Sequence, residues 1–163
     1  MTDIAALTSR LSPMLALVDR VVRLLDEVPY TLLALPLRVA VATVFWNSAM
    51  TKLANWDTAI ELFTEEYKVP LLPPEIAANL ALSIELTTPV LLVLGLLTRA
   101  AALVLLGMTT VIEIFVYPQA WPTHIQWAAM LLVLLCRGAG KLSLDHLVWQ
   151  RIRHLRGEDA PTN

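Results

Sequence analysis

Long apolar stretches occupy residues 31–50, 76–97, 100–117 and 125–136 of this sequence. A helix that crosses a bilayer needs about 20 apolar residues, within a range of about 17–25. The first three stretches reach or approach that length. The fourth does so if it runs from Pro122 to Arg137, because proline is tolerated in a first helical turn and a bilayer can thin locally. The stretches lack the polar face of a soluble bundle, so they predict an all-α integral membrane four-helix bundle.

The composition excludes other classes of protein. Charged residues make up only 16% of the chain, against about 25% in soluble domains. The net charge of −2 lacks the basic excess of a nucleic-acid-binding protein, so we expect no nucleic acid partner. Cys136 lies in an apolar run without metal-type Cys/His spacing, so we expect a buried structural thiol and no metal site.

We expect three segments: an amphipathic surface segment, a four-transmembrane-helix domain and a basic tail, at residues 1–30, 31–142 and 143–163. Ser12 and Pro13 predict the start of a helix that lies along the membrane surface. We expect the tail to dock on anionic lipid headgroups and to be disordered after Gly157.

The connection after the first apolar stretch is long enough to hold a short helix across the outer opening of the bundle. Asp57 is expected to cap this helix. Its apolar edge would consist of Ile60, Phe63 and Tyr67, and a proline-rich segment would end it.

Basic residues divide unequally between the two sides of such a bundle. Ten of the 12 lysines and arginines fall on one side, where Arg38, Arg99 and Arg137 mark the inner boundary of the bilayer. The other side has only Lys52 and Lys68. Since basic loops stay in the cytoplasm, we expect a multi-pass protein with both termini cytoplasmic.

Four ionisable residues lie within the apolar stretches or next to their ends, each 13 or 14 residues from one of those arginines: Lys52, Glu85, Glu113 and His124. At 1.5 Å per residue, all four reach a depth of roughly 20 Å and share one layer. A buried charge costs about 2.5–3.5 kcal/mol near the bilayer centre, so this layer needs a reason to exist. We therefore regard these residues as candidate catalytic groups.

Several interpretations of this layer stay open. Lys52 can pair with Glu85 or with Glu113, and His124 can complete a network. Two carboxylates against one lysine suggest a proton-linked site, because burial and like charge both favour the protonated acid. The Lys52 and Glu85 pair could instead only fix helix register, and His124 could be a snorkelling side chain. Candidate substrate-binding neighbours are Trp46, Asn47, Thr88, Trp127 and Tyr117.

A set of motifs follows this layout: Leu37-Arg38 at the start of the first helix, Phe45, Lys52, Glu85, the inner turn Gly95-Leu96-Leu97-Thr98-Arg99, and Gly138-Ala139-Gly140 with Ser143-Leu144-Asp145. Over about residues 35–148 the chain resembles the DoxX family. The resemblance implies a four-helix protein of the bacterial inner membrane, related to the small membrane subunit of thiosulfate:quinone oxidoreductase. Some relatives are associated with membrane oxidoreductase complexes and oxidative-stress defence.

Other relatives occur beside genes for modified metal-handling peptides. The chain is most similar to this last group, through Phe45-Trp46, Glu65-Glu66-Tyr67, and Val116-Tyr117-Pro118 with Trp121 and His124.

The leading functional hypothesis is a membrane subunit of a redox system that binds quinone or a small sulfur species at the polar layer. Lys52 would supply positive charge, Glu85 its counter-ion, and Glu113 and His124 proton acceptance. No covalently bound cofactor is expected, so turnover needs bound quinone or a membrane or periplasmic redox partner. The alternatives are a proton-linked transporter or permeability factor, and a non-catalytic membrane anchor for partner proteins. A homo-oligomer also stays open.

Overall fold

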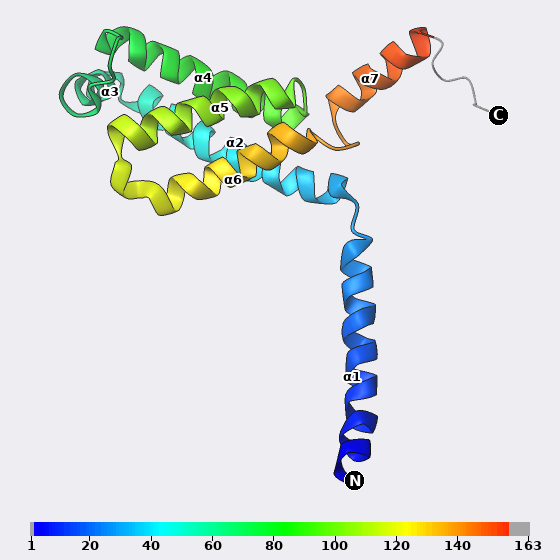
Figure 1. Ribbon diagram of the computed structural model, residues 1–163. Coiled ribbons are helices and arrows are strands. Elements are labelled where there is room, and N and C mark those ends of the chain that lie inside the picture. Colours follow the sequence, from blue (N-terminus) through cyan, green and yellow to red (C-terminus); the bar gives the residue numbers. More distant parts are fainter. Residues whose placement is uncertain (1, 157–163) are drawn as a thin grey trace.

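The structure is a computed structural model that describes residues 2–156, with side chains from Met14 onward. Every regular element in this part of the chain is helical (Figure 1). In order, the elements are α1 Thr2–Asp26, α2 Tyr30–Ala54, α3 Trp56–Leu62, the π-helix η1 Phe63–Tyr67, α4 Pro74–Leu94, α5 Thr98–Val111, the π-helix η2 Ile112–Val116, the 3-10 helix η3 Pro118–Ala120, α6 Trp121–Arg137 and α7 Leu144–Leu155.

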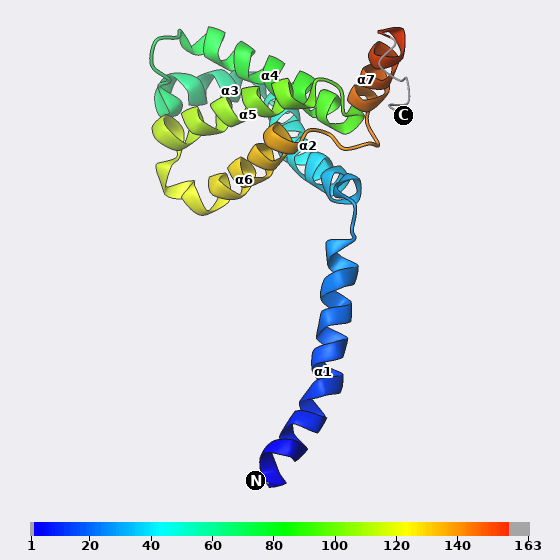
Figure 2. The same cartoon turned by 45° about the vertical axis from the view of Figure 1, so that its right-hand side comes forward.

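Helices α2, α4, α5 and α6 lie side by side and form the bundle (Figures 1 and 2). Its core combines alanines with larger side chains: Val41, Ala42, Phe45, Leu92, Ala101, Ala102, Leu105, Leu131 and Leu134. Small residues at these contacts let membrane helices approach closely. The predicted all-α four-helix bundle is confirmed.

Three helices in the described residues are long and apolar enough to cross a membrane: Tyr30–Ala54, Pro74–Leu94 and Thr98–Val116. The fourth helix, α6, has 17 residues, which is the lower end of the length that spans a bilayer, at about 17–25 residues. Large apolar side chains such as Val93, Leu103 and Leu132 point outward from the bundle. In a soluble protein such an exterior would be an aggregation hazard, whereas lipid solvates it, so the chain is a membrane protein.

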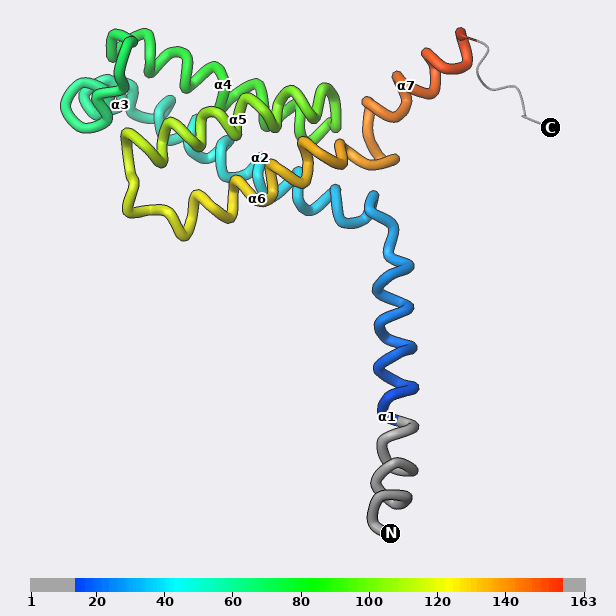
Figure 3. Tube along the Cα trace, in the orientation of Figure 1, coloured from blue at the N-terminus to red at the C-terminus, as the bar shows by residue number. Residues whose placement is uncertain are grey.

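Helix α1 projects from the bundle and runs crosswise to the bundle helices (Figure 3). It begins at Thr2, so the predicted start at Ser12 and Pro13 is wrong. The residues before Pro13 are helix formers such as alanine and leucine, and one missing hydrogen bond at the proline does not end the helix. Its position along a membrane surface stays a prediction, and the predicted disorder after Gly157 concerns residues outside those described.

One end of the bundle is covered by α3 and η1 (Figure 1). Phe63 of η1 packs into a cluster with Ala77, Ala78 and Ala81 of α4. Ile60 and Tyr67 flank this cluster, so the predicted apolar edge is confirmed. Asp57 does not cap the helix, because the N-cap residue is Asn55 and no side chain bonds there. Asp57 lies in the first turn instead, where a carboxylate is favourable to the helix dipole.

At the other end of the bundle the Arg38 side chain is buried, with 2% of its surface exposed. Its guanidinium donates hydrogen bonds to the carbonyl oxygens of Leu92, Val93, Ala139 and Leu142. Carbonyl groups at the end of a helix have no partner within that helix. Arg38 is therefore a structural clamp on the last turn of α4 and on the α6–α7 loop, in addition to lying near the predicted inner boundary.

The free thiol of Cys136 is exposed, so the predicted burial is wrong. Leu134, two residues earlier on α6, is fully buried. Successive helical residues are separated by about 100°, so Cys136 lies on the opposite face of the helix from Leu134. An apolar sequence run therefore did not mark the core face.

Candidate functional site

A cavity of about 390 Å³ lies in the bundle on the side covered by η1. Its lining comes from α2, η1, α4, α5, η2 and α6 and is mostly apolar. The polar exceptions are Ser48, Lys52, Glu85, His124 and two tyrosines, Tyr67 and Tyr117. An apolar pocket with a few converging polar groups is the usual form of a small-molecule site.

Lys52 and Glu85 form a buried ion pair between α2 and α4. The Lys52 Nζ lies 2.8 Å from each carboxylate oxygen of Glu85 and 2.9 Å from Ser48 Oγ. The Ser48 hydroxyl in turn donates to Glu85 Oε1 at 2.9 Å. All three ammonium N–H groups are thus used within the protein. The pair can place an electrostatic field in the cavity, but Lys52 has no spare donor for a ligand.

His124 and Glu113 form a second pair, between α6 and the π-helix η2. The His124 Nδ1 lies 2.6 Å from Glu113 Oε2. An ionised carboxylate only accepts hydrogen bonds, so the proton of this contact is assigned to Nδ1. The two acids therefore do not share Lys52, and each has its own basic partner. The predicted arrangement of two carboxylates around one lysine is replaced by two separate pairs.

The second ring nitrogen of His124, Nε2, makes no hydrogen bond within the part of the chain that the structure describes. The single fully buried side-chain atom without a partner among those residues is Thr98 Oγ1. Nε2 is therefore not fully buried, although only 4% of the His124 surface is exposed, and His124 lines the cavity. With Nδ1 held by Glu113, Nε2 can accept a proton as neutral imidazole or donate one as imidazolium.

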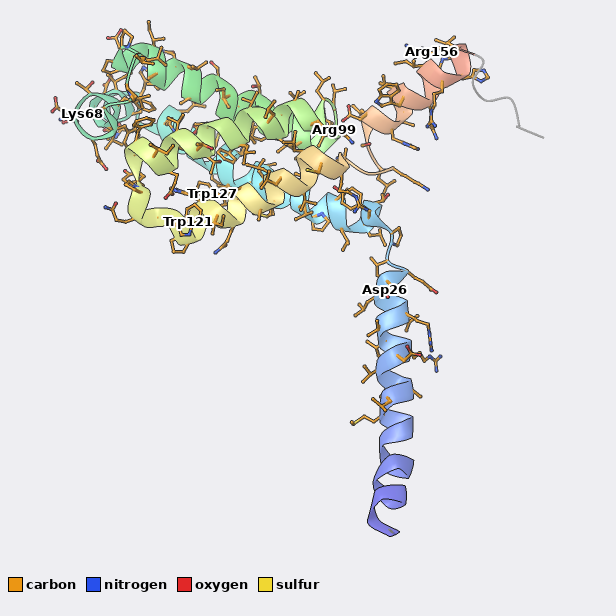
Figure 4. All side chains as sticks on the ribbon, viewed as in Figure 1. Asp26, Lys68, Arg99, Trp121, Trp127 and Arg156 are labelled. Carbon is orange, nitrogen blue, oxygen red and sulfur yellow. The ribbon has the colours of Figure 1, made fainter. Side chains whose placement is uncertain are left out.

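Aromatic side chains frame this imidazole. The Trp127 ring lies 5.1 Å from the His124 ring and 5.7 Å from Phe45, centroid to centroid. Figure 4 shows Trp121 and Trp127 along α6, and only Trp127 lines the cavity. The Trp127 and Phe45 rings give the cavity an aromatic wall beside its proton-exchanging group.

The covering segment η1 is held by a tyrosine contact. The Tyr117 hydroxyl donates to Glu66 Oε1 at 2.7 Å, and its ring packs edge-on against Tyr67 at 5.6 Å. The hydrogen bond to the Glu66 carboxylate, with desolvation, raises the pKa of Tyr117 above its usual value. Two π-helices, which are often found at functional sites, meet at this contact, since η1 supplies Glu66 and η2 leads into Tyr117.

The structure gathers most of the predicted site residues. Lys52, Glu85, His124, Trp127 and Tyr117 line the cavity, and Glu113 contacts His124 from behind. Three predicted residues lie elsewhere: Trp46 and Asn47 are exposed, and Thr88 is buried but bonds to the Ile84 carbonyl oxygen.

Sequence reasoning missed some residues of the site. Ser48 lies one helical turn before Lys52, so its spacing could have revealed it. Tyr67 and Phe63 were expected only as the edge of a loop helix, and nothing in their spacing indicated that they line a cavity.

The other predicted structural residues lie at the opposite end of the bundle. Asp145 accepts hydrogen bonds from the backbone N–H groups of Leu97, at 2.7 Å, and Thr98, at 3.0 Å. Arg99 donates to the Cys136 carbonyl oxygen, and Arg137 lies over the Tyr30 ring. No group of three or more potential metal ligands occurs among the described residues.

Comparison with known proteins agrees with this architecture. The model of the DoxX family matches residues 33–118, more than half of the chain. An uncharacterised protein of Haemophilus influenzae is 32% identical over 124 residues, which cover 69% of this chain and 80% of that protein. No solved structure matches significantly. The matched region contains α2, α4 and α5 with the Lys52–Glu85 pair, and the chain belongs to the DoxX family.

Proposed function

We propose that this protein is a membrane subunit of a redox system and that its cavity binds a quinone or a small sulfur species. The observation that carries the proposal is the Nε2 of His124, which is not fully buried and is oriented by Glu113 in an otherwise apolar cavity. The cavity volume of about 390 Å³ lies within the usual range for ligand pockets, about 300–1,000 Å³.

Each group has a defined role in this proposal. The aromatic wall of Phe45 and Trp127 contacts the ligand ring. His124 takes a proton from a quinol hydroxyl when the quinol is oxidised, or returns one when a quinone is reduced. Glu113 holds the ring and stabilises the imidazolium that forms. Lys52 and Glu85 act through their field, because their hydrogen-bonding capacity is already used.

The electrons must come from or go to another group. Described residues offer no metal cluster, and an amino-acid chain of this kind has no electron carrier of its own. We infer a partner in the membrane or the periplasm that carries flavin, metal or thiols. The basic residues at the α7 end support a bacterial inner-membrane location with both termini cytoplasmic. In that orientation the η1 side would face the periplasm.

The test is mass spectrometry of small molecules that the protein retains in native-lipid particles. Wild-type protein is expected to retain a quinone or a sulfur compound, and Trp127→Leu and His124→Gln are expected to lose it. Trp46→Leu is the matched control, because Trp46 is an exposed tryptophan of the same bundle that does not line the cavity.

Two results would overturn the proposal. One is the absence of any retained quinone or sulfur compound in wild-type protein, and the other is equal retention in all variants. A pH-dependent solute flux in liposomes, abolished in His124→Gln, would favour the proton-linked transporter. A cellular phenotype that survives Lys52→Met and Glu85→Gln but not removal of the outer loop would favour the anchor.

A further inference from the structure

A second, more open pocket of about 820 Å³ lies at the opposite end of the bundle from the cavity. Its lining comes from the start of α2, the α4–α5 turn, the end of α6, the α6–α7 loop and α7. Figure 4 shows Arg99 at this end, between the bundle and α7. The pocket shares no lining residue with the cavity proposed as the redox site.

The charged side chains of this pocket are mainly cationic: Arg99, Arg137, Lys141 and Arg153, with His146 beside them. Among the described residues, none of these four cations has a carboxylate within ion-pairing distance. The one acid in the lining, Asp145, is already bound by the N–H groups of Leu97 and Thr98. The pocket lining therefore carries an excess of positive charge, with four cations and one carboxylate.

The surroundings of the pocket indicate the kind of anion that fits. Arg99 lies in the first turn of α5, and Arg137 is the last residue of α6. The pocket therefore lies at the level where the membrane-crossing helices begin and end. Leu97 and Trp149 give it a largely exposed apolar rim. Tryptophan is enriched at the headgroup level of a bilayer. Cationic pockets at this level bind the phosphate groups of anionic lipids.

We propose that this pocket binds the phosphate groups of an anionic phospholipid, with the acyl chains in the surrounding bilayer. A free inorganic phosphate ion carries the same chemical group as the lipid headgroup. The experiment must therefore distinguish binding of the lipid from binding of the free ion. Lys141 and Arg153 are exposed, and neither side chain makes a hydrogen bond or an ion pair among the described residues. Their replacement should leave the fold intact.

The experiment compares two double variants that each remove two positive charges. Lys141→Gln with Arg153→Gln changes the pocket, and Arg151→Gln with Arg156→Gln changes the same helical region outside the pocket lining. Delipidated protein is titrated with cardiolipin, phosphatidylcholine or inorganic phosphate. Native mass spectrometry counts the bound lipid, and the shift of melting temperature reports binding of each probe.

We expect cardiolipin to bind and stabilise wild-type protein. The pocket variant should bind it roughly 30-fold more weakly, because each substitution removes one positive charge that attracts the lipid phosphates. The control variant should bind cardiolipin like wild type. Equal weakening in both variants would overturn the proposal, since it would indicate diffuse surface charge. The proposal would also be overturned if wild-type protein bound phosphatidylcholine as tightly as cardiolipin, or if inorganic phosphate stabilised it as much as cardiolipin does.

Discussion

Arg38 and Asp145 bind opposite ends of the turn that joins α4 to α5. The Arg38 guanidinium donates to carbonyl oxygens in the last turn of α4, including that of Leu92. The Asp145 carboxylate accepts from the N–H groups of Leu97 and Thr98 at the start of α5. Both helix ends would otherwise have unpaired backbone groups. Two charged side chains from distant parts of the sequence therefore complete one turn.

Replacement of Arg38 should destabilise the fold. Arg38→Met leaves the carbonyl groups of Val93, Ala139 and Leu142 without this donor, whereas Leu92 keeps the Gly95 N–H. At about 1–3 kcal/mol for each lost partner, we expect a loss of at least about 3 kcal/mol. Arg38→Lys restores some of these bonds and should lose less. Thermal unfolding in detergent measures both, and Arg20→Met on the exposed α1 is the control. Equal melting temperatures for Arg38→Met and Arg20→Met would show that the clamp contributes nothing.

Replacement of Asp145 should have a smaller effect on the same turn. Asp145→Ala removes the acceptor for two N–H groups at the start of α5, which costs about 0.5–2 kcal/mol for a helix cap. Asp57→Ala is the control, because no capping hydrogen bond to a side chain is present at the start of α3. A drop in melting temperature that is larger for Asp57→Ala would contradict the assignment.

Glycine at position 95 should be required for close packing in this turn. It adopts a left-handed conformation with φ +65°, and a Cβ added there would lie 2.5 Å from the Ser143 Cβ. Gly95→Ala should therefore lose at least about 1–2 kcal/mol from the left-handed backbone alone. Gly107→Ala is a matched control with open space around it and should gain about 0.5–1 kcal/mol of helix stability. Changes in melting temperature of the same sign for both variants would refute this account.

The Lys52–Glu85 pair should show strong coupling in a double-mutant cycle. Lys52→Met leaves a buried, unpaired carboxylate, and loss of one partner of a buried pair costs about 3–5 kcal/mol. Lys52→Met with Glu85→Leu removes both charges and should recover most of that loss. Additive effects of the two substitutions on unfolding would contradict the pairing. If the double variant still retains its ligand, the pair only fixes helix register.

Alkaline pH should weaken the contact between Tyr117 and Glu66. The pKa of Tyr117 is raised in the folded protein, so its neutral form is favoured there, and its contribution to stability is complete below the unfolded pKa of about 10. That contribution is lost as the pH rises beyond this value. Wild-type melting temperature should fall more steeply above about pH 10 than that of Tyr117→Phe. Parallel pH profiles for the two proteins would count against the contact.

The bundle could be predicted from the sequence more completely than the pairing of charged groups within it. The apolar stretches and the depth of Lys52, Glu85 and His124 are properties of single helices, so counting residues was sufficient to predict that these three groups lie near one another, with Glu113 beside His124. Which acid would pair with Lys52 was not decided by depth. The choice depends on the rotation and order of neighbouring helices, and the bundle places Glu85 beside Lys52 and Glu113 beside His124.

An all-α membrane protein with a layer of ionisable groups could be predicted from the amino-acid sequence, because apolar length and charge spacing are local quantities. The packing of the helices was needed to show that Arg38 is a buried clamp, that Cys136 faces outward and that Trp46 and Asn47 lie away from the cavity. These outcomes depend on which face of each helix meets a neighbour. In a chain that is apolar on nearly every face, hydrophobicity does not distinguish the core from the lipid, so packing between helices made that distinction.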